Sequence, residues 1–149
     1  MVYWFTGQPG HGKTKLGEKL KHHLETNGTK PVIQVDGDDL RELFKNKDYS
    51  KEGRIKNITF AQGMSKFLNN KGYDVVVSVV SPYRDIREDF KKDMGDDIME
   101  FYVNTTEIRG KEHFHVIDYE PPLSNYINVD TTKDTPRKSL LKIIEHLKP

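Results

Sequence analysis

The feature that most constrains this chain is the stretch GQPGHGKT at residues 7–14, directly after the apolar run VYWF at residues 2–5. The eight residues match the pattern G-x-x-x-x-G-K-[ST], whose glycines let the backbone aim N–H groups at phosphate oxygens. Such a loop lies between a strand and a helix, and the positive end of the helix faces the same oxygens. The stretch therefore predicts a strand, a phosphate-binding loop and a helix at the start of the fold.

A dinucleotide-binding fold and a GTPase both fit this stretch less well. The glycine spacing is G-x-x-G-x-G, whereas dinucleotide-binding folds use G-x-G-x-x-G. The tripeptide NKD at residues 46–48 lacks the extra residue of the guanine-reading pattern N-K-x-D, and it does not follow a predicted strand. A chance glycine-rich turn is disfavoured because a predicted strand and a predicted helix flank the match.

Apolar, β-branched or aromatic runs predict five strands, at residues 2–5, 31–35, 74–80, 99–103 and 126–129. Apolar residues at helical spacing predict helices over residues 13–27, 54–70, 85–93 and 135–147. Strands that alternate with helices predict an α/β fold of the P-loop NTPase type, a three-layer sandwich with a parallel five-stranded sheet and helices on both faces. The length of 149 residues and the lack of an internal linker predict a single domain over residues 1–149.

Composition narrows the class of protein. The net charge is only +1, so no overall field attracts nucleic acid or a membrane surface. The chain has no cysteine and no charged leader, and no apolar stretch approaches the roughly 20 residues of a membrane span. These observations favour a cytoplasmic enzyme without nucleic-acid or membrane partners, and they leave a homodimer open.

Polar residues gather after the predicted strands, in DGDDLR at residues 36–41, SPYRDIR at 81–87 and NTTEIRGKEHFH at 104–115. Ligands of parallel α/β sheets bind outside the carboxyl ends of the strands, so these clusters are expected beside the phosphate-binding loop. The arginines suit a second anion, because a guanidinium matches phosphate or sulfate oxygens bidentately. A solvated surface ion pair is the alternative for any single arginine.

These patterns predict three groups of site residues. Phosphate and Mg²⁺ ligands come from the loop and the second strand end: Gly7, Gln8, Pro9, Gly10, His11, Gly12, Lys13 and Thr14, with Asp36 as a second metal ligand. Lys13, Asp36 and Asp38 are the candidate catalytic residues, and Arg41, Arg54 and Arg84 the candidate anion ligands. Arg54 and Asn57 are three residues apart on one helix face, and Ser50 is expected to cap that helix.

Five stretches resemble the adenylylsulfate kinase family, in order along nearly the whole chain. They are VYWFTGQPGHGKT, DGDDLR, YSKEGRIKN, SPYRDIR and FHVIDYEPP. The resemblance implies a P-loop kinase that uses ATP and Mg²⁺ to phosphorylate the 3′-hydroxyl of adenosine 5′-phosphosulfate in sulfate assimilation. The loop alone is unspecific, whereas four further matches in the same order are specific.

The resemblance also implies roles by position. Arg41, Arg54 and Asn57 hold the phosphosulfate nucleotide, and Phe114 stacks on its adenine. The resemblance makes Ser81 a further candidate catalytic residue, because it matches a serine proposed as a phospho-enzyme intermediate in the family; direct in-line transfer is the alternative. The remaining implied acceptor ligands are Asp38, Tyr49, Ser81, Pro82, Tyr83, Arg84 and Lys111, while Arg109 covers the ATP side.

This sequence departs from the family pattern in three places, one of which is that Asn57 is followed by ITF rather than by arginines. It starts at the first strand, and only residues 104–113 separate Val103 from Phe114, where the family has a longer basic lid. We expect the short lid to weaken ATP binding, to admit water or to mark a changed acceptor. Two alternatives therefore stay open: a kinase for another hydroxyl, such as a polynucleotide 5′-end or a sugar, and a nucleotide-binding protein without turnover.

Overall fold

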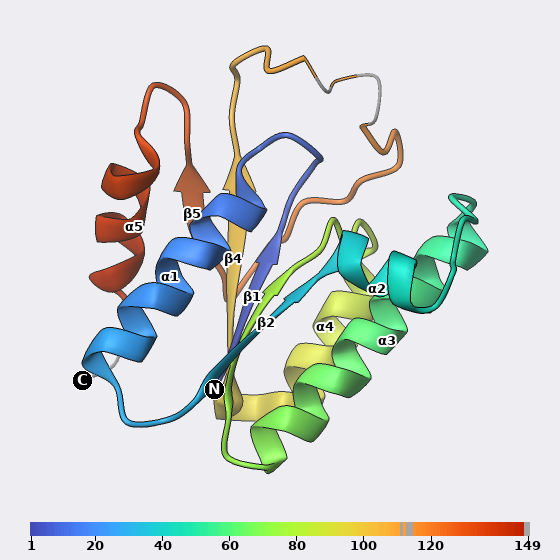
Figure 1. Ribbon diagram of the computed structural model, residues 1–149. Helices are drawn as coiled ribbons and strands as arrows, with labels where there is room; N and C mark the ends of the chain where they lie inside the picture. Colours follow the sequence, from blue (N-terminus) through green and yellow to red (C-terminus); the bar gives the residue numbers. More distant parts are fainter. Residues whose placement is uncertain (111, 113–114, 148–149) are drawn as a thin grey trace.

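The computed structural model describes residues 1–110, 112 and 115–147, and its centre is a five-stranded parallel sheet (Figure 1). The strands are β1 (Val2–Thr6), β2 (Val32–Asp36), β3 (Asp74–Ser78), β4 (Ile98–Asn104) and β5 (Ile127–Asp130), in the order β2-β3-β1-β4-β5. The strand before the glycine loop is thus the central one, with β3 and β4 paired on either side. All five carboxyl ends lie at one edge, because every pair of neighbouring strands is parallel.

Helices cover both faces of the sheet (Figure 1). They are α1 (Lys13–Asn27), α2 (Gly37–Leu43), α3 (Lys51–Asn70), α4 (Arg84–Met94) and α5 (Pro136–Ile144), with a short 3₁₀ turn η1 (Gly95–Asp97). One apolar cluster joins the sheet to α1 and α5, and a second joins it to α2, α3 and α4. The predicted three-layer α/β fold is confirmed.

Side chains of β1 alternate between the two layers, as the period of two in a strand requires. Val2 and Trp4 pack in the cluster with α3 and α4, whereas Tyr3 and Phe5 pack in the cluster with α1 and α5. Every residue of β1 is buried. This strand therefore anchors the glycine loop to the buried centre of the sheet.

The sequence did not predict α2, and its apolar period showed α3 only from Arg54 onward, three residues after the helix begins. The α2 helix spans seven residues and buries only Leu40, so it is too short to show an apolar period. The Asp36 carboxylate caps it by accepting from the Asp38 amide at 2.9 Å. At α3 the predicted Ser50 cap is confirmed, because its hydroxyl accepts from the Gly53 amide and the helix begins at Lys51.

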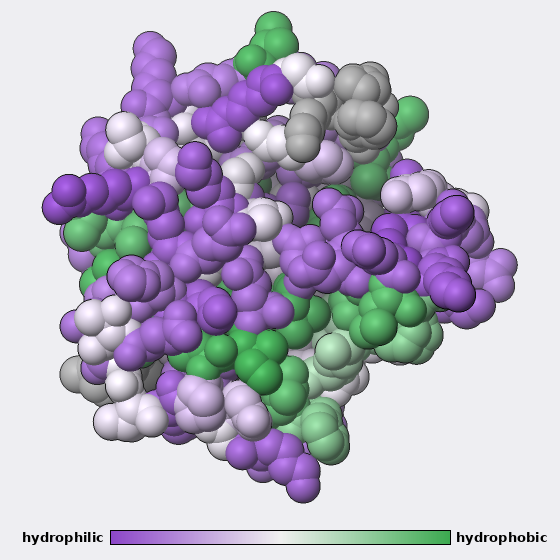
Figure 2. All heavy atoms as spheres, viewed as in Figure 1, coloured by the Kyte–Doolittle hydropathy of each residue, from purple (hydrophilic) through white to green (hydrophobic). Residues whose placement is uncertain are grey.

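The surface is polar, as a charged fraction of 32% requires. On the face shown in Figure 2, hydrophilic residues cover most of the area and hydrophobic ones form smaller patches between them. In the part of the chain that the structure describes, no helix combines the length and apolarity needed to cross a membrane.

Candidate active site

The glycine loop leaves β1 at the carboxyl edge of the sheet and leads directly into α1. Gly7, Gly10 and Gly12 have φ angles of 155°, 82° and 101°, which residues with a Cβ rarely adopt. A Cβ on Gly7 would also lie 2.2 Å from the Val103 carbonyl oxygen of β4. The spacing of these glycines therefore follows from the backbone geometry at this edge.

Lys13 begins α1, and its side chain is buried in the loop. Its Nζ donates to the Gln8 carbonyl oxygen at 2.9 Å, which folds the side chain back over the loop. Gly12 is the N-cap of α1 and has no side chain to accept from the first-turn amides. A buried ammonium and the positive end of a helix thus face the same space, which favours an anion there.

Thr14 and Asp36 form the candidate metal site. The Thr14 hydroxyl donates to Asp36 Oδ2 at 2.8 Å, while Oδ1 of the same carboxylate accepts from the Asp38 amide. Mg²⁺ binds through one or two protein oxygens plus substrate phosphates and water. This pair fits Mg²⁺, whereas a closed cage is absent, since no group of three His, Cys, Asp or Glu able to hold a metal occurs among the described residues.

Two hollows adjoin the loop. The loop pocket has a volume of about 420 Å³, and a flanking pocket of about 220 Å³ lies between the loop, α5 and the segment after β4. Gly12, Lys15 and Arg109 line both of them. Arg109 is fixed there, because its Nη2 lies 3.0 Å from Glu107 Oε2 and donates to the Thr131 carbonyl oxygen at 2.9 Å.

A third hollow, of about 360 Å³, opens on the other side of the loop and is called the acceptor pocket below. It brings together most of the polar residues that the sequence predicted for a second anion. Its polar and aromatic lining consists of Asp38, Arg41, Tyr49, Arg54, Asn57 and Ser81, with Pro9, Pro82 and Val116 among the apolar residues.

The cations of the acceptor pocket are held by neighbouring groups. Arg41 donates to the carbonyl oxygens of Asn46 and Asp48 at 3.1 and 3.0 Å, and its guanidinium lies 4.0 Å above the Tyr49 ring. Arg54 makes a 3.7 Å ion pair with the exposed Asp118. A bound anion can replace this long contact at little cost, because surface ion pairs contribute little stability.

Two buried polar atoms of residues in this pocket have no hydrogen-bond partner among the described residues: Asn57 Oδ1 and Ser81 Oγ. The Asn57 amide nitrogen donates to the Gly37 carbonyl oxygen at 3.3 Å, which fixes the orientation of the side chain. Buried polar groups are normally paired, so these two atoms are available to a ligand or a water molecule in the pocket.

Two predicted acceptor ligands lie elsewhere. The Arg84 guanidinium donates twice to the Pro121 carbonyl oxygen, at 2.9 and 2.8 Å, and Arg84 does not line the acceptor pocket. The Tyr83 ring is buried below Lys51 and is not part of the lining either. The predictions for Lys111 and Phe114 fall outside the described residues.

Gln8 and His11 hold the chain that returns after the short segment following β4. The Gln8 amide group pairs with the Val116 backbone in both directions, at 2.8 Å in each case. The His11 ring meets the His115 ring edge-on, with centroids 5.1 Å apart. Neither residue lines the loop pocket, so their contacts fasten the return of the chain to the loop.

The buried position of His11 predicts that the stability of the protein depends on pH. Burial lowers the pKa of His11 from 6.5 to about 4, and His115, Lys13 and Arg109 add to the effect. The unfolded chain thus binds more protons between these values, so the free energy of unfolding falls as the pH drops from 6.5 to 4. Thermal melts across this range should show a shallower decline for His11→Gln, with His22→Gln as the control. Equal slopes for wild type and His11→Gln would contradict this assignment.

Sequence reasoning missed Thr131 and Asp134, which line the flanking pocket. Thr131 follows β5 directly, and its hydroxyl donates to the His11 carbonyl oxygen at 3.2 Å. The rule that ligands bind beyond the carboxyl ends of strands would have found this residue, had it been applied to the last strand.

Comparison with known proteins places these features in a family. Residues 1–114 match the sequence model of the family described as adenylylsulphate kinase. A probable adenylyl-sulfate kinase of Pyrococcus abyssi is 33% identical over 165 aligned positions, covering 97% of this chain and 93% of the relative. A cytidine diphosphoramidate kinase of Campylobacter jejuni is 29% identical over 144 positions, covering 94% and 84%. The structure of the Mycobacterium tuberculosis APS kinase in complex with AMPPNP and APS has a TM-score of 0.80 at 23% identity, covering 97% of this chain and 95% of that one.

A loop pocket that opens onto a second, arginine-lined pocket is the layout of a P-loop kinase, in which a phosphoryl group passes between two bound molecules. The matches in sequence extend over most of the chain and select one group among these kinases. The chain belongs to the adenylylsulphate kinase family, and the prediction from the sequence motifs is confirmed.

Proposed function

We propose that this chain is an ATP-dependent kinase, acting as one domain, that phosphorylates the 3′-hydroxyl of adenosine 5′-phosphosulfate and releases ADP. Beside the family membership, one observation carries the proposal: the loop pocket and the acceptor pocket share a wall. This wall is formed by Pro9, Gly37, Asp38, Val79 and Val80. Asp38 lines both pockets, so it lies beside both of the anionic molecules that the pockets would bind.

The donor nucleotide belongs in the loop pocket. The buried ammonium of Lys13 and the N-terminal amides of α1 bind the β- and γ-phosphates. Thr14 and Asp36 are placed to hold Mg²⁺, which neutralises phosphate charge when it is bound. Arg109 lines both the loop pocket and the flanking pocket, and there it holds the nucleoside end of ATP.

The acceptor belongs in the pocket beside it. Arg41 and Arg54 supply two cations for the phosphosulfate group, and Asn57 Oδ1 is a buried acceptor atom for a hydroxyl or amino group of the substrate. Ser81 lines the same pocket with its Oγ buried, and it is assigned to binding rather than to a covalent step.

The transfer then proceeds in line. The 3′-oxygen of the acceptor attacks the γ-phosphorus, a new P–O bond forms, and the bond to the β-phosphate oxygen breaks. The proton of the attacking hydroxyl passes to Asp38, whose carboxylate lies on the shared wall. ADP leaves with the bridging oxygen.

The lengths of the alignments support a second candidate acceptor, a cytidine diphosphoramidate. The alignment with the Pyrococcus relative is 165 positions long, which exceeds the 149 residues of this chain and requires gaps in it. The alignment with the Campylobacter kinase has only 144 positions and spans 94% of the chain. Over the aligned region this chain is thus closer in length to the second relative than to the first. Both acceptors carry a 5′-linked anion that the same two arginines suit.

An acceptor panel decides between the two substrates. Purified protein with Mg²⁺-ATP is offered adenosine 5′-phosphosulfate, cytidine diphosphoramidate, a sugar or a polynucleotide 5′-end, and products are identified by mass. We expect one of the two nucleotide acceptors to gain a single phosphoryl group in step with ADP. Comparison with a reaction lacking acceptor measures the hydrolysis that the short lid permits. ADP without any phosphorylated product would overturn the kinase proposal.

A further inference from the structure

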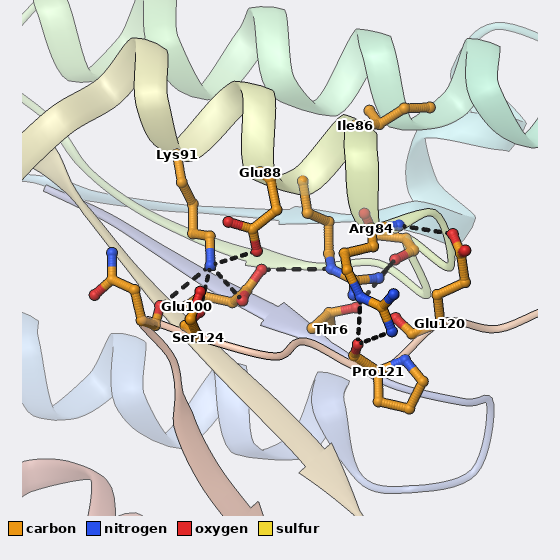
Figure 3. Close-up of polar contacts among 12 residues, drawn as sticks. Thr6, Arg84, Ile86, Glu88, Lys91, Glu100, Glu120, Pro121 and Ser124 are labelled. Atoms are coloured by element: carbon orange, nitrogen blue, oxygen red, sulfur yellow. Dashed lines mark hydrogen bonds and ion pairs between the residues drawn. The ribbon is translucent and has the colours of Figure 1, made fainter.

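Helix α4 carries two buried cations, Arg87 and Lys91, beside one buried carboxylate, Glu100 of β4. Figure 3 shows Lys91 and Glu88 of α4 pointing toward Glu100 and Ser124. Lys91 Nζ lies 3.0 Å from Glu100 Oε1 and 2.8 Å from Glu88 Oε1, and Arg87 Nε lies 3.5 Å from Glu100 Oε2. Two carboxylates thus balance two cations between α4 and β4.

The hydrogen bonds of Arg87 go to the main chain rather than to a carboxylate. Its Nη1 donates to the Ser81 carbonyl oxygen at 2.6 Å, and its Nη2 donates to the Glu120 carbonyl oxygen. The guanidinium also lies 5.5 Å from the centre of the Tyr119 ring. One rigid fork therefore connects two segments that are far apart in the sequence.

Lys91 extends this connection along the second segment. Its Nζ donates to the carbonyl oxygens of Ser124 and Asn125 at 3.0 and 3.2 Å. We call residues 119–125 the return segment. Figure 3 shows that Arg84 contacts Pro121 of this segment as well. Three basic residues of α4 thus hold the return segment by its carbonyl groups.

The other end of the fork is a strained residue of the acceptor pocket. Ser81 has a φ of 47°, an uncommon conformation for a residue other than glycine. Its carbonyl oxygen also accepts from Thr6 Oγ1 at 3.2 Å, and Thr6 in turn contacts the Tyr119 hydroxyl at 2.9 Å. Such a conformation persists only where the surroundings over-determine it, and it is typical of functional sites.

We propose that Arg87 is a positioning residue for acceptor phosphorylation, a role that rests on the proposed function of this chain. By bonding to the Ser81 and Glu120 carbonyls at once, Arg87 fixes the wall of the acceptor pocket and the return segment as one unit. Glu100 neutralises the buried guanidinium. Lysine cannot replace the fork, because a single ammonium does not reproduce its fixed pair of donors.

The test compares three variants of the network with a control on the same helix. The variants are Arg87→Lys, Arg87→Met and Arg87→Met/Glu100→Gln, and the control is Met94→Ala, which loosens α4 without touching Ser81 or the return segment. Acceptor kcat and KM and the ATP Kd are measured below the melting temperature of every variant. Hydrogen exchange is followed in peptides covering residues 81–83 and 119–125.

We expect Arg87→Met to lower kcat/KM for the acceptor about 100-fold, the scale of a misplacement near 1 Å, with an unchanged ATP Kd. Arg87→Lys should fall between this variant and wild type. Both peptides should exchange faster in Arg87→Met, whereas Met94→Ala should keep wild-type kcat/KM despite a lower melting temperature.

Several results would overturn the inference. One is a kcat/KM of Arg87→Met equal to that of Met94→Ala, and another is unchanged exchange in both peptides. If Arg87→Met does not fold, the charge-balanced double variant carries the test, and wild-type kcat/KM in it would overturn the role. If wild type phosphorylates no acceptor, the proposed function fails. The exchange measurement then still decides whether Arg87 holds the two segments.

Discussion

Lys13→Ala is expected to abolish ATP turnover while the protein stays folded. The Lys13 ammonium is buried at the start of α1, where its Nζ already closes the loop onto Gln8. During transfer this cation offsets the charge on the β- and γ-phosphates. The loss of one preorganised donor of this kind costs roughly 100- to 1,000-fold in kcat.

The measurement is ADP release at saturating Mg²⁺-ATP, with the melting temperature recorded for each protein. Lys19→Ala, which removes another lysine of α1 that lines none of the three pockets, is the control and should retain activity. A folded Lys13→Ala protein with wild-type turnover would rule out the glycine loop as the donor site.

Arg54→Ala and Asn57→Ala are expected to raise the acceptor KM much more than the ATP KM. Both residues line the acceptor pocket and are absent from the lining of the loop pocket. Hydrogen bonds to charged groups contribute roughly 1.5–3 kcal/mol, so Arg54→Ala should raise the acceptor KM about 10- to 100-fold. Asn57→Ala also removes the hydrogen bond from Asn57 to the Gly37 carbonyl oxygen. Asn57→Ala should therefore lower kcat more than Arg54→Ala does.

Steady-state kinetics with each substrate varied in turn checks this prediction. Lys56→Ala, on the exposed side of α3 between the two residues, is the control. A rise of the ATP KM alone would mean that the two nucleotides occupy the opposite pockets from those proposed.

The layout of the sheet and the loop was predictable because the signals are local. The glycine spacing, the apolar β1 and the helix stop at Gly28 each reflect a preference of a few neighbouring residues, and the structure follows them. The rule that ligands bind beyond the carboxyl ends of parallel strands likewise placed Asp36, Arg41 and Ser81 at one edge of the sheet. Arg54 and Asn57 came from a separate helix start, and the structure places both in the lining of the acceptor pocket.

The contacts of the two arginines in SPYRDIR could not be predicted in the same way. An arginine that binds substrate and one that binds backbone have the same sequence signal. Arg84 and Arg87 contact carbonyl groups of Pro121 and Glu120, 37 and 33 residues away along the chain. Those contacts exist only because the chain returns beside α4, which no local pattern encodes.

The reciprocal pairing of Gln8 with Val116 has a consequence for protein engineering. The Gln8 side-chain amide bonds to the Val116 backbone as a neighbouring strand would, so residue 8 is structurally coupled to the point where the chain returns after β4. A chimera that receives the longer lid of a relative must rejoin this chain at Val116 in the same register, or it must exchange residue 8 along with the lid. Lid grafts that ignore this coupling would separate the loop from the segment that follows it, even where each transplanted part is sound by itself.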